Sequence, residues 1–136
     1  MNEIALLMTA CVDPSAVSPS IMRNDVETRL ADYSTALDFW LRLNEPRIQQ
    51  IVFVENSGFP LDEFRRVVAT ANIYKRDVEF LQSASNWCPP EVHYGWAELA
   101  MVDRAIEESK HLSQACRGAF KIALLCAIKI ALIIYD

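Results

Sequence analysis

"IVFVENSGFPLDEF", residues 51–64, contains the transition that decides the fold. Four apolar residues run directly into Glu55, Asn56 and Ser57, and an amphipathic pattern begins a few residues later. A short run that is apolar on both faces is typical of a central strand in a parallel sheet. Pro60 suits the first turn of a helix, where its missing N–H leaves no hydrogen bond unmade. The stretch therefore predicts a buried strand, a polar turn and a helix, in that order.

The rest of the chain repeats this alternation. Apolar runs predict further strands at residues 3–12, 77–82 and 119–125, and apolar residues at helical spacing predict helices at 26–43, 61–71 and 96–113. Strands separated by helices need crossover connections, which give a mostly parallel sheet covered on both faces. We therefore predict one α/β domain over residues 1–136, with about four strands.

Composition and charge exclude several classes of protein. Hydrophobic residues make up 52% of the 136 and charged residues 23%, which suits a packed domain rather than a disordered chain. The formal net charge is -5, and no run rich in Lys and Arg occurs. Because an acidic chain has no electrostatic attraction to a polyanion, we predict no nucleic-acid partner.

The cysteines and the N-terminus indicate a reducing compartment. Cys11, Cys88, Cys116 and Cys126 lie far apart, with no C-x-x-C and no nearby His at ligand spacing. This pattern fits neither a zinc site nor a disulfide framework. The residues after Met1 lack the basic region of a signal peptide. We therefore expect a cytoplasmic location.

The apolar C-terminal segment, residues 119–136, has about the length of a membrane span. Lys129 lies near its middle, where a charge costs about 2.5–3.5 kcal/mol on insertion scales. Lys121 adds a second charge close by. We therefore predict a buried strand or helix here and no transmembrane span.

Polar side chains follow the predicted strands at points where a ligand would bind. In an open parallel sheet, ligands bind beyond the carboxyl ends of the strands. Each group, taken alone, is also ordinary turn chemistry. The functional interpretation depends on all of them meeting at one edge of the sheet. The candidates are Thr9, Ala10 and Asp13 after the first strand, Glu55, Asn56 and Ser57 after the second, and Gly95 and Glu98 at the start of the third helix.

Several familiar signatures are absent. The sequence contains no G-x-G-x-x-G and no G-x-x-x-x-G-K-[ST], which excludes a standard dinucleotide or P-loop fingerprint. It contains no G-x-S-x-G nucleophile elbow and no D-x-D motif. We therefore assign no metal site and no cofactor, although a divalent cation stays open.

A resemblance is carried by six stretches in order: LLMTACVDP, DYSTALDFWL, IQQIVFVENSG, DVEFLQ, YGWAELAMVDRAIEES and FKI. Together they resemble the N-terminal half of bacterial polysaccharide-biosynthesis glycosyltransferases, over most of residues 4–122. That half is similar to the nucleotide-sugar-binding part of a GT-A fold. The resemblance implies a Rossmann-like three-layer sandwich.

The resemblance also implies a donor site and a reaction. Thr9, Ala10 and Asp13 would line the base and ribose, Glu55 and Asn56 would hydrogen-bond the ribose hydroxyls or the base edge beside Ser57, and Gly95 and Glu98 would lie near the diphosphate or sugar. The donor would be a UDP- or GDP-type nucleotide sugar. A hexose would pass to a saccharide or lipid-linked acceptor at the inner face of the membrane, in cell-surface polysaccharide biosynthesis.

The chain departs from this family after Ile122. The family continues with Thr-Gly-Arg, a polar stretch and a second half that carries acceptor and catalytic groups, whereas residues 123–136 here are an apolar tail. We therefore expect a truncated or frameshifted chain, and we assign no catalytic residue. The alternative is a non-catalytic α/β interaction module that dimerises or binds a partner through its apolar C-terminus.

Overall fold

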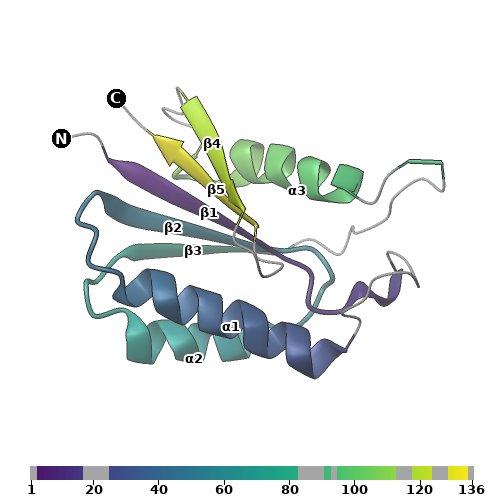
Figure 1. The fold of residues 1–136 in the computed structure, drawn as a ribbon, viewed down its shortest axis with the longest axis horizontal. Coiled ribbons are helices and arrows are strands. Elements are labelled where there is room, and N and C mark those ends of the chain that lie inside the picture. Colours follow the sequence, from purple (N-terminus) through teal and green to yellow (C-terminus); the bar gives the residue numbers. More distant parts are fainter. Residues whose placement is uncertain are drawn as a thin grey trace.

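The computed structural model describes residues 3–16, 25–82, 91–92, 95–112, 118–123 and 129–134, the last two as backbone alone. Along the chain these form β1 (Ile4–Ala10), the short 3-10 helix η1 (Pro14–Ala16), α1 (Val26–Arg42), β2 (Ile48–Glu55), α2 (Asp62–Ala71), β3 (Asp77–Gln82), α3 (Gly95–Glu108), β4 (Gly118–Ala123) and β5 (Lys129–Ile134). Figure 1 shows one sheet with helices on both of its faces. The predicted α/β class is confirmed.

The described strands lie in the order β3-β2-β1-β5-β4. β1 pairs with β2, and β2 with β3, in parallel. β5 pairs antiparallel with β1 on one side and with β4 on the other. The three strands that alternate with α1 and α2 therefore form the predicted parallel sheet.

The apolar tail accounts for the difference from the predicted sheet of about four strands. It contributes β5, which pairs with β1 from Ile4↔Ile134 to Met8↔Ile130, so the sheet has five described strands. β4 runs in the direction of β1 but is separated from it by β5. A nearby antiparallel partner needs no crossover helix, which explains the insertion. Residues 124–128 and 135–136 of the predicted tail lie outside the described residues.

Of the strand and the helix that were both predicted for the tail, the structure has a strand at residues 129–134. In the part of the chain that the structure describes, no helix has the length and apolar character needed to cross a membrane. Cys88, Cys116 and Cys126 lie outside the described residues, so the interpretation of their thiols stays a prediction.

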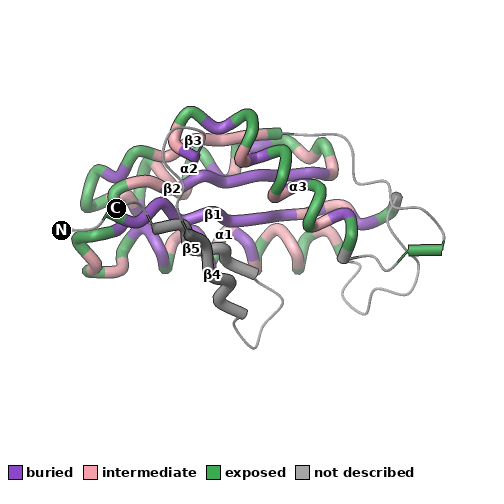
Figure 2. The backbone as a smooth tube through the Cα atoms, turned by 90° about the horizontal axis from the view of Figure 1, so that it is seen from above, coloured by how far each residue is buried: buried purple, intermediate pink, exposed green. Residues whose placement is uncertain are grey.

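The central strands are buried on both faces, as the apolar run in β2 predicted (Figure 2). Alternate side chains of β1 divide between two cores. Leu6 and Met8 pack in a cluster with α1 and α2, whereas Ala5 and Leu7 pack with α3. Since α1 and α2 cover one face and α3 the other, each residue's position along a strand decides which helices it meets.

Helix α1 begins at a side-chain cap. Asp25 accepts hydrogen bonds from the backbone N–H of Thr28, at 2.8 Å, and from its hydroxyl, at 2.6 Å. These bonds hold the pKa of the Asp25 carboxyl below its ordinary value. The cap satisfies one of the N–H groups that a helix leaves open at its start.

The buried guanidinium of Arg76 hydrogen-bonds the backbone at the amino ends of the parallel strands. Arg76, which is 5% exposed, precedes β3 and donates to carbonyls contributed by α1, by the loop after it and by β2. The acceptors are Leu43 at 2.6 Å, Ile48 at 2.8 Å, Leu41 at 2.9 Å, Glu45 at 3.1 Å and Trp40. The last carbonyls of a helix have no partner within it, so Arg76 satisfies groups that α1 leaves open.

Helix α3 ends earlier than residue 113, its predicted end, because Ser109 diverts the backbone. The Ser109 hydroxyl accepts from the N–H groups of His111 and Leu112, both at 3.1 Å, which draws them out of the helical pattern. The same hydroxyl donates to Glu79 of β3 at 2.6 Å. This bond fastens the end of α3 to the sheet.

Candidate functional site

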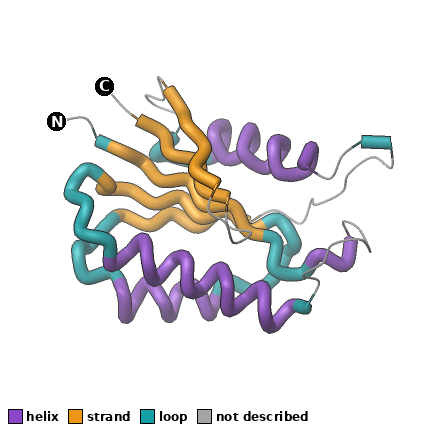
Figure 3. Tube along the Cα trace, viewed as in Figure 1, coloured by secondary structure: helices purple, strands orange, loops and turns teal. Residues whose placement is uncertain are grey.

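The loops that follow β1 and β2 meet at the carboxyl edge of the sheet (Figure 3). The N–H of Asn56 donates to the carbonyl of Ala10 at 3.0 Å and continues the strand pairing by one residue. The N–H of Asp13 donates to the hydroxyl of Ser57 at 3.0 Å. Two of the three predicted polar groups are therefore joined directly.

The third group joins them through Thr9. Its hydroxyl lies 3.5 Å from a carboxylate oxygen of Glu98, in the first turn of α3. Gly95 is the first residue of that helix. The start of α3 therefore lies at the same edge as the ends of β1 and β2, as Figure 1 also shows.

Glu55 is fully buried, and its carboxylate is engaged by the chain itself. It accepts from the backbone N–H of Val12 at 3.0 Å, of Ser57 at 3.0 Å and of Phe59 at 3.0 Å, and from the Ser57 hydroxyl. Charged acceptors make the strongest bonds of this kind. A ribose hydroxyl would reach Glu55 only by displacing one of these donors. The predicted ligand contact of Glu55 stays a prediction, beside a structural role that the contacts do show.

The two faces of the sheet divide the predicted residues. Phe53 belongs to the core under α1 and α2, so strand alternation places Glu55 on that face. Val54 belongs to the core under α3, and Thr9 contacts α3. Asn56 follows the last residue of β2, so the alternation does not assign its side chain to a face. The residues thus share one edge, but Glu55 points away from the face that Thr9 and Glu98 share.

Asn56 carries an unsatisfied buried acceptor. The residue is 3% exposed, and its Oδ1 accepts no hydrogen bond from any residue that the structure describes. A buried acceptor without a donor costs about 1–3 kcal/mol, so each such group needs an explanation. Ser34 and Trp40, on α1, also carry such atoms. Asn56 differs from these two because it lies at the edge where ligands bind in parallel sheets.

The Asp13 side chain forms its hydrogen bonds within the loop after β1. Its carboxylate accepts from the N–H of Ser15 at 3.0 Å, at the start of η1. Hydrogen bonds from Ser15 hold the pKa of Asp13 below its ordinary value. The loop after β1 is thereby shaped by its own side chain before any ligand binds.

Arg29 and Tyr33 of α1 support the same loop, and the sequence argument missed both. The Nε of Arg29 donates to the carbonyl of Cys11 at 2.7 Å, and its Nη2 donates to the Tyr33 hydroxyl at 3.0 Å. Burial raises the pKa of that hydroxyl above its ordinary value. The available signal was their spacing of four residues, which puts both on one face of α1.

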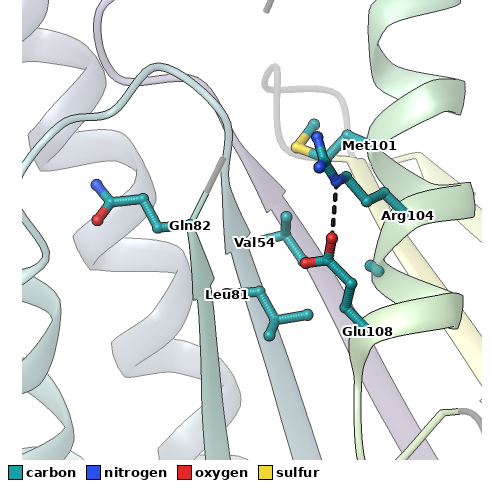
Figure 4. Close-up of a pocket in the computed structure, with 7 residues that line it drawn as sticks. Val54, Leu81, Gln82, Met101, Arg104 and Glu108 are labelled. Atoms are coloured by element: carbon teal, nitrogen blue, oxygen red, sulfur yellow. Dashed lines mark hydrogen bonds and ion pairs between the residues drawn. The ribbon is translucent and has the colours of Figure 1, made fainter. Parts of the chain in front are cut away.

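A shallow hollow lies on the α3 face, beside the ends of β2 and β3 (Figure 4). Val54, Leu81 and Met101 form its apolar floor. Arg104 and Glu108 of α3 form an ion pair at 2.7 Å on its rim. The hollow contains none of the predicted site residues, but it shares a face of the sheet with Thr9 and Glu98. The described residues include no group of three or more His, Cys, Asp or Glu able to hold a metal ion.

No known protein family, curated protein or solved structure matches the chain. A function is therefore inferred from the geometry of the carboxyl edge and from the resemblance of the sequence stretches.

Proposed function

We propose that this chain is a glycosyltransferase-like domain that binds a nucleotide-diphospho-sugar at the carboxyl edge of its parallel strands. The proposal combines the Rossmann-like interpretation of the fold with the polar residues gathered at that edge. From the resemblance we also propose that the protein lies in the cytoplasm and takes part in the synthesis of cell-surface polysaccharides. The observation that carries the proposal is the buried Oδ1 of Asn56, which accepts no hydrogen bond from any described residue.

The Asn56 acceptor calls for a ligand that brings a donor. Uracil and guanine each present a ring N–H beside a carbonyl, which complements the oxygen and nitrogen of a carboxamide. Pairing there removes the cost of the buried acceptor, so binding gains from both partners. This supports a UDP- or GDP-type donor.

The start of α3 supplies the other half of the proposed site. A helix N-terminus offers free N–H groups and a partial positive charge, which favour a phosphate. The diphosphate would lie near Gly95. Glu98, which repels a phosphate, would instead accept hydrogen bonds from sugar hydroxyls, together with Thr9 at 3.5 Å from it.

The proposal covers donor binding. Sugar transfer to a saccharide or lipid-linked acceptor needs a general base near the acceptor hydroxyl. Neither the resemblance nor the geometry assigns that role to a described residue. Hexosyl transfer is therefore the reaction that the resemblance implies, and donor recognition is the part that the site supports.

Titration calorimetry with UDP-, GDP- and CMP-sugars tests the proposal. We expect heat with a UDP- or GDP-sugar, and a loss of affinity of about tenfold or more for Asn56→Ala. Asn44→Ala, at an exposed position after α1, is the matched control and should bind like the unmodified chain. A folded chain that gives no heat with any of the sugars would exclude nucleotide-sugar binding.

For the alternative, an interaction module, the strand order limits where a partner strand could pair with the sheet. β5 is paired on both sides by β1 and β4, so its backbone has no open edge for a partner. Among the described strands, β3 and β4 form the edges of the sheet. Light scattering after size exclusion tests the dimer: a stable dimer that binds no nucleotide favours the module, and a monomer contradicts dimerisation but not binding of another partner.

A further inference from the structure

Glu55 joins the two loops of the candidate site through one buried carboxylate. Val12, whose N–H it accepts at 3.0 Å, belongs to the loop after β1. Ser57 and Phe59, whose N–H groups it also accepts at 3.0 Å, belong to the loop after β2. Three separate backbone groups therefore depend on a single side chain.

The Ser57 hydroxyl extends this connection. It donates to Glu55 and accepts from the N–H of Asp13 at 3.0 Å. Asn56 stands between Glu55 and Ser57, and its own N–H is held by Ala10 at 3.0 Å. Both neighbours of Asn56 and its backbone are thus fixed, which sets the direction of its side chain.

We propose that Glu55 is a positioning residue, which acts on the ligand through Asn56 rather than by touching it. This inference rests on the proposed function. A buried carboxylate is tolerated where hydrogen bonds satisfy it, and here they come from the backbone of both loops. Glutamine at position 55 would keep the shape, but its NH2 group would face backbone donors. The substitution Glu55→Gln should therefore loosen the loops and misplace the Asn56 acceptor.

Backbone amide NMR without any ligand tests whether Glu55 holds the loops. The amide protons of Val12, Ser57 and Phe59 should resonate downfield in the unmodified chain and move upfield together in Glu55→Gln. Glu63→Gln is the matched control, because that carboxylate lies on α2 and pairs with Arg66 at 3.2 Å. The control should leave the three amides unchanged. Equal spectra for Glu55→Gln and the control would overturn the inference.

A double-mutant cycle tests whether Glu55 acts through Asn56. Glu55→Gln should weaken binding of the nucleoside diphosphate by about tenfold. Added to Asn56→Ala, it should cause no further loss, because a positioning residue has nothing left to position. Additive losses would show direct ligand contact and overturn the inference.

A milder variant keeps the test decisive if Glu55→Gln does not fold. Ser57→Ala removes the hydroxyl between Glu55 and Asp13 and leaves the carboxylate in place. Its loss of affinity should also vanish in the Asn56→Ala background, and an additive loss would again overturn the inference. If the unmodified chain binds no nucleotide, the proposed function fails, and the amide shifts alone still decide whether Glu55 holds the loops.

Discussion

The two ends of the parallel sheet each contain one buried charged side chain that binds the backbone, and they differ in what is left over. At the amino end, Arg76 donates to five carbonyls from three segments. At the carboxyl end, Glu55 accepts from three backbone N–H groups, and beside it the Oδ1 of Asn56 accepts none from the described residues. The amino end fastens the fold, and the carboxyl end contains the polar group to which we propose that a ligand binds.

Trp40 sharpens this comparison, because its indole Nε1 near the amino end is also unsatisfied among the described residues. Its ring belongs to the apolar core under α1 and α2, where the packing of the ring explains its place. Asn56 is a buried polar residue at the carboxyl edge, where its N–H donates to the carbonyl of Ala10. A buried acceptor that receives no bond from the described residues needs an explanation, and for Asn56 we propose a ligand.

The largest expected effect is on Arg76. Arg76→Ala should lower the free energy of unfolding by about 3–5 kcal/mol, because it leaves five carbonyls without their donor. Arg76→Lys should recover only part, since an ammonium cannot reach acceptors spread around a planar fork. Urea unfolding measures both. Arg66→Ala, which removes a 75% exposed side chain on α2, should change the free energy of unfolding little. An equally small loss for Arg76→Ala would show that the hydrogen bonds of Arg76 do not stabilise the amino end.

Glu55 should show a smaller loss of stability and a larger loss of binding. Glu55→Ala leaves three N–H groups unsatisfied and should lower the free energy of unfolding by about 2–3 kcal/mol. Arg76→Lys, measured under conditions where it stays folded, should bind nucleotide like the unmodified chain. If the two substitutions weaken binding equally, the two ends of the sheet do not differ in function.

At Asn56, unlike at Arg76, we expect a substitution to remove nucleotide binding without lowering the free energy of unfolding. Asn56→Leu replaces the unsatisfied acceptor by apolar atoms, so the free energy of unfolding should hold steady or rise by about 1 kcal/mol, while nucleotide binding is lost. Chemical denaturation and calorimetry on one sample give both values. A clear loss of stability would mean that the Asn56 carboxamide serves the fold, which would remove the main support for a ligand at this edge.

Elements with local patterns were predictable from the sequence. The helix expected at residues 26–43 is observed as Val26–Arg42, and the strand expected at 77–82 as Asp77–Gln82, because apolar spacing and flanking turn residues are local signals. The meeting of Asp13 with Ser57 also followed, since the carboxyl ends of parallel strands share an edge.

The long-range contacts were not predictable. Arg76 binds carbonyls 28 to 36 residues earlier in the chain, and nothing near it in sequence indicates burial. Glu55 looked like a ligand residue because acids after a strand often are, but its partner Val12 lies 43 residues away. β5 likewise pairs with β1, at the other end of the chain, and an apolar run does not specify such a partner.

The smallest expected effect is on Asp25, which caps α1. Among the described residues it makes no hydrogen bond to Arg76 or Glu55. Its folded pKa lies below the ordinary 3.8, so its contribution to stability is present above the unfolded pKa and is lost as the pH falls through the folded value. Asn caps a helix without titrating. The melting temperature of the unmodified chain should therefore fall more steeply below pH 4 than that of Asp25→Asn, by a small margin. Thermal melts between pH 6 and pH 2 measure the difference. Parallel curves would mean that acid unfolding is governed by carboxylates that both chains keep, and that the cap contributes nothing to it.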